Sequence, residues 1–333
     1  MNVKLNHLIY SGMVRIAVVA LLTLMTACGG GMSTNKPNSE NIISINNNLE
    51  PNELPQAMLD AQYSQIYESF SPAFKGQISE ADFAGMAKDF TQGVESFEPT
   101  SAMKLNGNDQ RVWLNPSHDK GILAVFDETG FIVGLQIMNL SPWTDTDEML
   151  TTATYELPFQ GDWLVFWGGS NILVNYHYEY ESQRYAYDFI QAKHGLSFTG
   201  DPLKNDSYYA FGQNILAPAD GTVISVVNHI SDNEPVGVMN EKEPAGNVVV
   251  IDHGGEYSIL AHLKKGSVTV NPGDQVMLGD KIGELGNSGN SSEAHLHFQI
   301  SDGEDLFDSH SLNVRWKDGL NPIRGEIVQS TAY

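Results

Sequence analysis

The chain has 333 residues, of which 41 are acidic and 18 are basic, so its formal net charge is −23 at pH 7. This length is sufficient for two domains that each bury a core of their own. The strong negative charge argues against nucleic acid and anionic membrane surfaces as main partners, because both attract basic proteins. The charge therefore excludes classes of partner without identifying a substrate.

The first 27 residues have the pattern of a bacterial secretion signal. A basic lead precedes the apolar run 16–25, which is too short to span a bilayer as a mature helix. The following residues, Leu24–Cys28, resemble the lipobox of bacterial lipoproteins, which implies that Cys28 is lipidated and begins the mature chain. Cys28 is the only cysteine, and a lone exported cysteine cannot form an internal disulfide, so lipidation explains it better than a buried thiol does.

Residues 28–50 are rich in Gly, Asn and Ser and are predicted to form a flexible tether. We therefore expect an exported protein that a lipid anchor holds at a bacterial membrane. The periplasmic side of the outer membrane is favoured, since Gly29 stands where such lipoproteins carry the aspartate of inner-membrane retention.

Residues 51–141 predict a small α+β domain. Leu59, Tyr63, Ile66 and Phe70 recur at helical spacing and indicate one buried stripe. Ser79, followed by Asp82 three residues later, predicts the start of a second helix. Three strands are expected after it, over 111–114, 121–126 and 131–137. Helices followed by such strands faintly resemble the cone-shaped domains related to nuclear transport factor two.

Residues 142–330 are punctuated by Gly, Pro and Asn and show little helical periodicity, which predicts a mainly antiparallel β domain. Its sharpest feature is His295-Leu296-His297. Side chains two residues apart on a strand share a face, so both histidines face one side while Leu296 and Phe298 face the other. Such a pair is by itself a modest metal signal, because paired histidines also occur on exposed strands.

Five motifs across residues 205–300 strengthen this signal. In chain order they resemble the successive motifs of the lysostaphin/LytM zinc metallopeptidases, which have the duplicated-hybrid-motif fold. The resemblance implies one zinc ion, with His297 as a zinc ligand and with His262 and His295 assisting catalysis. The motifs are Ala217-Pro218-Ala219-Asp220-Gly221-Thr222-Val223, Gly246 to Gly254, Tyr257 to Leu263, Pro272 to Val276 and Gly286 to Phe298.

Catalytic zinc sites commonly use three protein ligands and leave a fourth position for water. The resembled family supplies two of these ligands from a His-x-x-x-Asp motif. Asp188 matches the aspartate, but Arg184 stands four residues before it. His177 is the predicted substitute: if residues 181–184 formed a tight hairpin, His177 would lie opposite Asp188, with β-carbons about 5 Å apart. A longer loop could serve equally well, because Ser182 and Gln183 lack the glycine or asparagine that two-residue hairpins favour. The alternatives are an ordinary strand histidine and a structural carboxylate paired with Arg184.

The resemblance implies a zinc endopeptidase that cuts peptidoglycan, within stem-peptide crosslinks or crossbridges. A catalytically silent relative that binds wall peptides, or that activates another hydrolase, is the main alternative, and the altered spacing at Arg184 supports it. A carbohydrate-binding module would instead predict exposed aromatic platforms without converging histidines. Control by a regulatory protein partner is left open.

Overall fold

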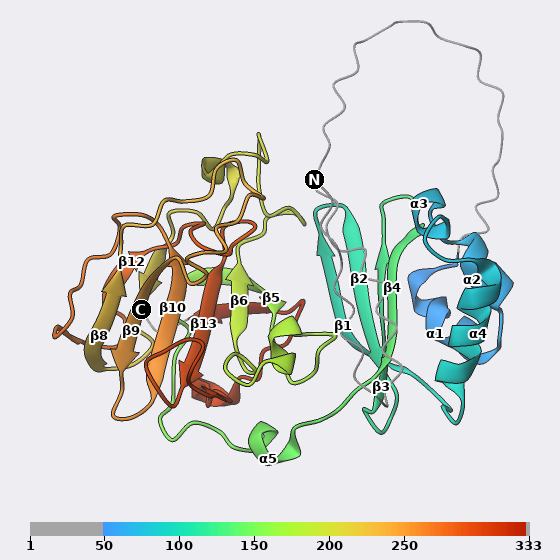
Figure 1. The fold of residues 1–333 in the computed structure, drawn as a ribbon, viewed down its shortest axis with the longest axis horizontal. Coiled ribbons are helices and arrows are strands. Elements are labelled where there is room, and N and C mark those ends of the chain that lie inside the picture. Colours follow the sequence, from blue (N-terminus) through green and yellow to red (C-terminus); the bar gives the residue numbers. More distant parts are fainter. Residues whose placement is uncertain (1–48, 331–333) are drawn as a thin grey trace, which may run out of the picture.

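The computed structural model describes residues 49–330, so the predicted leader, Cys28 and almost all of the tether lie outside the described residues. The N-terminal part places its helices on one face of a four-stranded antiparallel sheet with the order β1-β2-β3-β4, away from the C-terminal part (Figure 1). No helix among residues 49–330 combines the length and the apolar character that crossing a bilayer requires. The elements of this part are η1 (Pro51–Glu53), α1 (Leu54–Leu59), α2 (Tyr63–Glu68), α3 (Pro72–Lys75), α4 (Glu80–Thr91), β1 (Glu98–Leu105), β2 (Asn108–Leu114), β3 (Lys120–Phe126) and β4 (Ile132–Asn139).

The helix predicted after Ser79 is α4, and the Ser79 hydroxyl accepts a hydrogen bond from the Asp82 backbone N–H at 3.2 Å. The four residues of the stripe predicted over residues 59–70 lie in or against one core, but they do not share a single helix. Leu59 ends α1, Tyr63 and Ile66 lie on α2 and Phe70 follows it, because Ala61 adopts a left-handed backbone with φ of 55° and turns the chain. Ile66 and Phe70 are buried in the same core nevertheless.

The four-stranded sheet is buried on both faces. Along β3, Ile122 and Ala124 pack against the helices, whereas Leu123 and Val125 point to the opposite side. The three predicted strands correspond to β2, β3 and β4. The strand β1 was not predicted, because its polar residues Thr100, Ser101 and Lys104 obscure the apolar alternation.

The C-terminal part is built on a nine-stranded sheet, and its paired strands are antiparallel, as the sequence predicts. The sheet runs in the order β11-β8-β9-β10-β13-β6-β5-β15, with β14 beside β13, and β7 and β12 form a separate pair. The elements are α5 (Thr144–Asp147), β5 (Gly161–Trp167), η2 (Tyr176–Glu179), β6 (Tyr187–Ile190), η3 (Asn205–Ser207), β7 (Asn214–Leu216), β8 (Gly221–Val227), β9 (Asn247–Asp252), β10 (Tyr257–Leu263), β11 (Gln275–Val276), β12 (Lys281–Glu284), β13 (Leu296–Ser301), β14 (Ser311–Leu312), η4 (Lys317–Gly319) and β15 (Ile327–Ser330).

The face of the N-terminal sheet that the helices leave uncovered packs against the C-terminal part. One shared apolar cluster joins Leu123 and Val125 to Leu173 and Val174. A second joins residues of β1 to residues of β5 and β6, namely Met103, Leu105, Leu164 and Ile190. The two parts are therefore in continuous apolar contact, and the domain boundary at residue 141 stays a prediction.

Candidate metal centre

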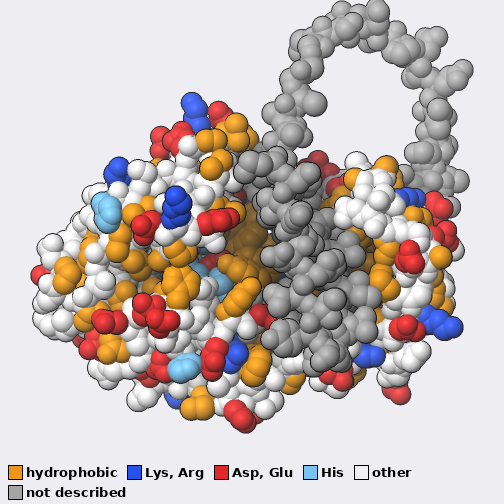
Figure 2. Space-filling model, in the orientation of Figure 1, with side chains coloured by type: hydrophobic (Ala, Val, Ile, Leu, Met, Phe, Trp, Pro, Cys, Tyr) orange, Lys and Arg blue, Asp and Glu red, His pale blue; other side chains and the backbone are white. Residues whose placement is uncertain are grey.

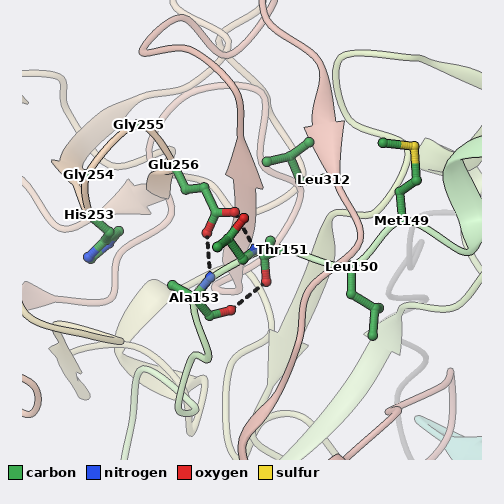
Figure 3. A pocket seen from close by; sticks show the side chains of 10 residues that line it. Met149, Leu150, Thr151, Ala153, His253, Gly254, Gly255, Glu256 and Leu312 are labelled. Atoms are coloured by element: carbon green, nitrogen blue, oxygen red, sulfur yellow. Dashed lines mark hydrogen bonds between the residues drawn. The ribbon is translucent and has the colours of Figure 1, made fainter.

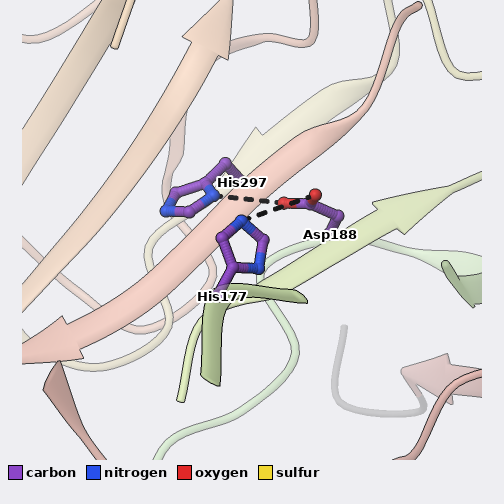
Figure 4. Close-up of side chains that lie close together, drawn as sticks. All are labelled: His177, Asp188 and His297. Carbon is purple, nitrogen blue, oxygen red and sulfur yellow. Dashed lines mark hydrogen bonds and ion pairs between the residues drawn. The ribbon is translucent and has the colours of Figure 1, made fainter. Parts of the chain in front are cut away.

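His177, Asp188 and His297 are buried, and their candidate ligand atoms all lie within 4.8 Å of one another (Figure 4). The His177 Nε2 atom is 3.7 Å from Asp188 Oδ2, and the His297 Nδ1 atom is 3.1 Å from Asp188 Oδ1. Both distances are below about 4 Å, the largest separation of two atoms that each bind one zinc ion at about 2 Å, whereas the span of 4.8 Å exceeds it, so a bound ion would draw the ligand atoms closer together. The structure thus brings together the three residues that the sequence singles out as ligands.

The path that brings His177 to this place is not the tight hairpin over residues 181–184 but the alternative of a longer loop. His177 lies on the short 3-10 helix η2 rather than on a strand, and a wide turn follows it before β6. The partner of Asp188 in the sheet is His297, in register between β6 and β13. Ser182 and Gln183 lack the left-handed preference that a two-residue hairpin needs, so the chain forms a longer turn there.

The hydrogen bonds around the two histidines show which of their nitrogens can donate to an amide oxygen. His177 Nδ1 faces Asn175 Oδ1 at 2.9 Å, and His297 Nε2 faces Gln299 Oε1 at 3.1 Å. An amide oxygen only accepts hydrogen bonds, so these nitrogens donate. His177 Nε2 then presents its lone pair towards the Asp188 carboxylate, and His297 Nδ1, 3.1 Å from Asp188 Oδ1, does so in the tautomer that carries the ring hydrogen on Nε2.

Lone pairs facing a carboxylate in a buried site call for a cation between them. His177 Nε2 is fully enclosed and has no hydrogen-bond partner. Two imidazoles and one carboxylate also match the ligand types of a catalytic zinc site. By their hydrogen-bond pattern and by their donor chemistry, the residues fit a zinc ion.

Electrostatics keep His177 and Asp188 in the protonation states that a metal requires. Burial lowers the pKa of His177 to about 3, so its imidazole is neutral near pH 7. Burial alone would raise the pKa of the Asp188 carboxyl, but His177, His295 and His297 together outweigh it and lower that pKa. A neutral imidazole and an ionised carboxylate are the forms that coordinate metal.

The two predicted catalytic histidines lie beside this cluster. The ring centroids of His262 and His295 are 4.7 Å apart, and the His262 ring is 5.9 Å from that of His297. His262 Nδ1 donates to the Ser288 carbonyl at 2.8 Å, and His295 Nδ1 donates to the Glu293 carbonyl at 2.9 Å. Each ring therefore keeps its Nε2 free, and His295 Nε2 is 3.7 Å from Asp188 Oδ1.

Asn175 and Gln299 were missed by the sequence reading, although both carried a signal. Gln299 is two residues from His297 on β13, so it shares the face of its neighbour. Asn175 stands two residues before His177, a spacing at which an Asn side chain bonds to the backbone ahead of it. Its amide nitrogen bonds to the carbonyls of Arg184 and Ala186, so the same side chain also ties the wide turn together.

One surface hollow lies apart from the cluster. A hollow of about 500 Å³ is lined by residues such as Met149, His253 and Leu312, and by none of the five histidine and aspartate residues above (Figure 3). The Glu256 carboxylate in it is bonded to the N–H of Thr152 and Ala153. Acidic side chains are scattered over both parts on the face shown in Figure 2, in keeping with the net charge.

Residues 206–309 match the sequence model of peptidase family M23. The peptidoglycan DD-endopeptidase ShyA of Vibrio cholerae serotype O1 is 34% identical over 89 residues, which are 26% of this chain and 20% of ShyA. An uncharacterized metalloprotease of Haemophilus influenzae is 35% identical over 90 residues, 27% of this chain and 16% of that protein. The solved catalytic domain of lysostaphin from Staphylococcus simulans is 19% identical, with 38% of this chain and 73% of that chain covered and a TM-score of 0.24.

The matches span about a fifth or less of the length of these curated relatives. The segment that matches the family includes His262, His295 and His297, whereas His177 and Asp188 precede it. Residues 206–309 of the chain therefore carry the sequence pattern of a peptidase family M23 domain.

Proposed function

We propose that the protein is a zinc-dependent endopeptidase that hydrolyses peptide bonds in peptidoglycan crosslinks. The observation that carries the proposal is the convergence of His177, Asp188 and His297, with the enclosed Nε2 of His177 aimed at the carboxylate. The family match supports peptidase chemistry, and the activity printed in the name of ShyA supports a peptidoglycan substrate.

His177 Nε2, Asp188 and His297 Nδ1 would hold one zinc ion. When bound, zinc would supply an activated water and polarise the scissile carbonyl. His262 and His295 present free Nε2 atoms on the same side of the sheet, so they can accept the proton of the attacking water and deliver it to the leaving amine. The balance is one water consumed, one C–N bond broken, and one carboxylate and one amine formed.

The division of roles between His297 of β13 and His295, which directly precedes that strand, gives the test. His297→Ala should abolish both zinc binding and wall hydrolysis, because it removes a ligand. His295→Ala should keep most of the zinc and lose turnover by about 100-fold or more, because it removes a proton-transfer group. Zinc content by elemental analysis and digestion of purified peptidoglycan measure the two effects, and equal zinc loss in both variants contradicts the assignment.

A catalytically silent relative is the second candidate, and the observation behind it is Arg184 at the position where the family motif carries histidine. Chelator treatment before the digestion assay separates the two. Activity that disappears with the chelator and returns with zinc supports the enzyme, whereas wall binding without cleavage at any zinc concentration supports the silent relative.

A further inference from the structure

The segment that delivers His177 rests on the N-terminal part of the chain. Leu173 is fully buried and Val174 is 1% exposed, and both pack with Leu123 and Val125 of β3 and with residues of β2. Asn175 follows directly, and His177 comes two residues later. The N-terminal sheet therefore forms one wall behind the chain that enters the metal centre.

The fit at this wall is close. A β-carbon added at Gly121 would lie 2.4 Å from Leu173 Cδ1 and 2.8 Å from Leu114 Cδ2, distances that real β-carbons do not show. Gly121 is an interior strand residue, where glycine otherwise weakens a sheet. A glycine here lets Leu173 approach the sheet.

Arg324 makes a second connection between the two parts. Its side chain is almost completely buried, and its guanidinium donates to the Leu173 carbonyl at 3.1 Å and to the Gln110 side-chain oxygen of β2. Its backbone carbonyl accepts a hydrogen bond from the Ser101 hydroxyl of β1 at 2.7 Å. Arg324 thus links the segment before His177 to β1 and β2 of the N-terminal sheet.

The same guanidinium begins a stack that ends at the metal ligand. It lies 3.9 Å from the centroid of the Trp167 ring, and the Trp167 and Tyr176 rings are 5.4 Å apart. The Tyr176 ring is 3.9 Å from the His177 ring. His177 has no strand ladder of its own, since it lies on the four-residue helix η2, so packing of this kind has to fix its position.

We propose that the N-terminal sheet is a positioning element of the metal centre, acting on His177 through Leu173 and through Arg324. Gly121, Gln110 and Arg324 are positioning residues that touch no ligand atom. The inference rests on the proposed function, because it assigns the sheet a role in zinc binding. On this inference the N-terminal part of the chain helps to position a metal ligand and is not only a spacer.

The test compares the zinc affinity of the full-length wild type with that of full-length variants. Each affinity is measured with zinc chloride in competition with a chromogenic chelator. Gly121→Ala adds one methyl group against Leu173 and should weaken zinc binding about tenfold, as changes behind a metal ligand typically do. Gly134→Ala is the matched control on the same sheet, since a β-carbon there meets Val125 at an ordinary 3.6 Å. Ile122→Ala destabilises the opposite, helix-facing side and controls for a general loss of stability.

Gln110→Ala is the second variant if Gly121→Ala fails to show a cooperative thermal transition, because it adds no atoms. Weakened zinc binding in these two variants, with wild-type affinity in both controls, supports the inference. Wild-type affinity in Gly121→Ala and Gln110→Ala overturns it, and so does an equal loss in Ile122→Ala. A wild-type chain that binds no zinc overturns the proposed function first, so the two failures are distinguishable.

Discussion

At the residue scale, the candidate site depends on how four buried or half-buried histidines share their hydrogens. In each ring one nitrogen donates to an oxygen that only accepts: Asn175 Oδ1, Ser288 O, Glu293 O and Gln299 Oε1. The other nitrogen is then left with a lone pair for a metal or a proton. Fixing the tautomer through the distant nitrogen is the usual way in which proteins prepare histidine ligands.

These neutral imidazoles predict how stability depends on pH. Burial lowers the pKa of His177 to about 3 and that of His262 well below its ordinary 6.5. Between about pH 6.5 and about pH 3 these two imidazoles therefore bind more protons in the unfolded chain than in the folded metal-free chain, so they lower the free energy of unfolding as the pH falls. Urea denaturation at pH 5 should show lower stability than at pH 7.

The variant His262→Gln isolates one of these groups. Its loss of stability between pH 7 and pH 5 should be smaller than that of the wild type, because one buried imidazole no longer resists protonation. His118→Gln, in an exposed loop, serves as the control and should keep the wild-type slope. An unchanged slope in His262→Gln would show that this imidazole is not held neutral by the fold.

At the element scale, the short helix α5 braces the wide turn that follows His177. The Asp147 carboxylate accepts hydrogen bonds from the Tyr178 hydroxyl at 2.6 Å and from the Tyr185 hydroxyl at 2.7 Å. Tyr178 directly follows His177, and Tyr185 precedes Asp188 by three residues. A segment outside the sheet thus holds both flanks of the turn that separates two candidate ligands.

Asp147→Ala should therefore lower stability by about 2 kcal/mol, since it leaves the Tyr178 hydroxyl without its acceptor and leaves the Tyr185 hydroxyl only Thr146 Oγ1. Zinc binding should weaken with it, because the turn loses its brace. Asp145→Ala, on the exposed side of α5, is the control and should change neither property. Thermal denaturation and chelator competition measure the two effects. Zinc affinity that stays at the wild-type value in Asp147→Ala would show that α5 does not position the metal ligands.

The regular elements of the site could be predicted from the sequence, whereas the irregular ones could not. The alternation around His295 and His297 predicts their shared face, and in the structure Leu296 and Phe298 pack into the core behind them. The position of His177 depends on Asn175, on a turn without glycine and on contacts with β2 and β3. Such contacts join residues far apart in the chain, and no local pattern records them. The roles of the five site residues stay predictions.

At the scale of the whole molecule, the N-terminal and C-terminal parts share two apolar clusters, so they pack against each other rather than being connected by the chain alone. The resemblance of the first part to domains related to nuclear transport factor two stays a prediction. So do the export of the protein and its lipid anchor at Cys28, which lies outside the described residues.

The anchor has its own test. Cys28→Ser should release the protein from the membrane fraction into the soluble periplasmic fraction of the cells that make it, and should abolish metabolic labelling with palmitate, because the thiol is the proposed attachment point. Wall hydrolysis by the purified variant should equal that of the wild type, since the tether lies outside the site. Labelling that persists in Cys28→Ser would disprove the anchor.

The central claim is that one metal ion joins His177, Asp188 and His297, and zinc-edge anomalous diffraction from crystals grown with zinc tests it most directly. The claim predicts one strong peak at about 2 Å from His177 Nε2, from an Asp188 carboxylate oxygen and from His297 Nδ1. A peak bound elsewhere, or one that His177 does not contact, would contradict it.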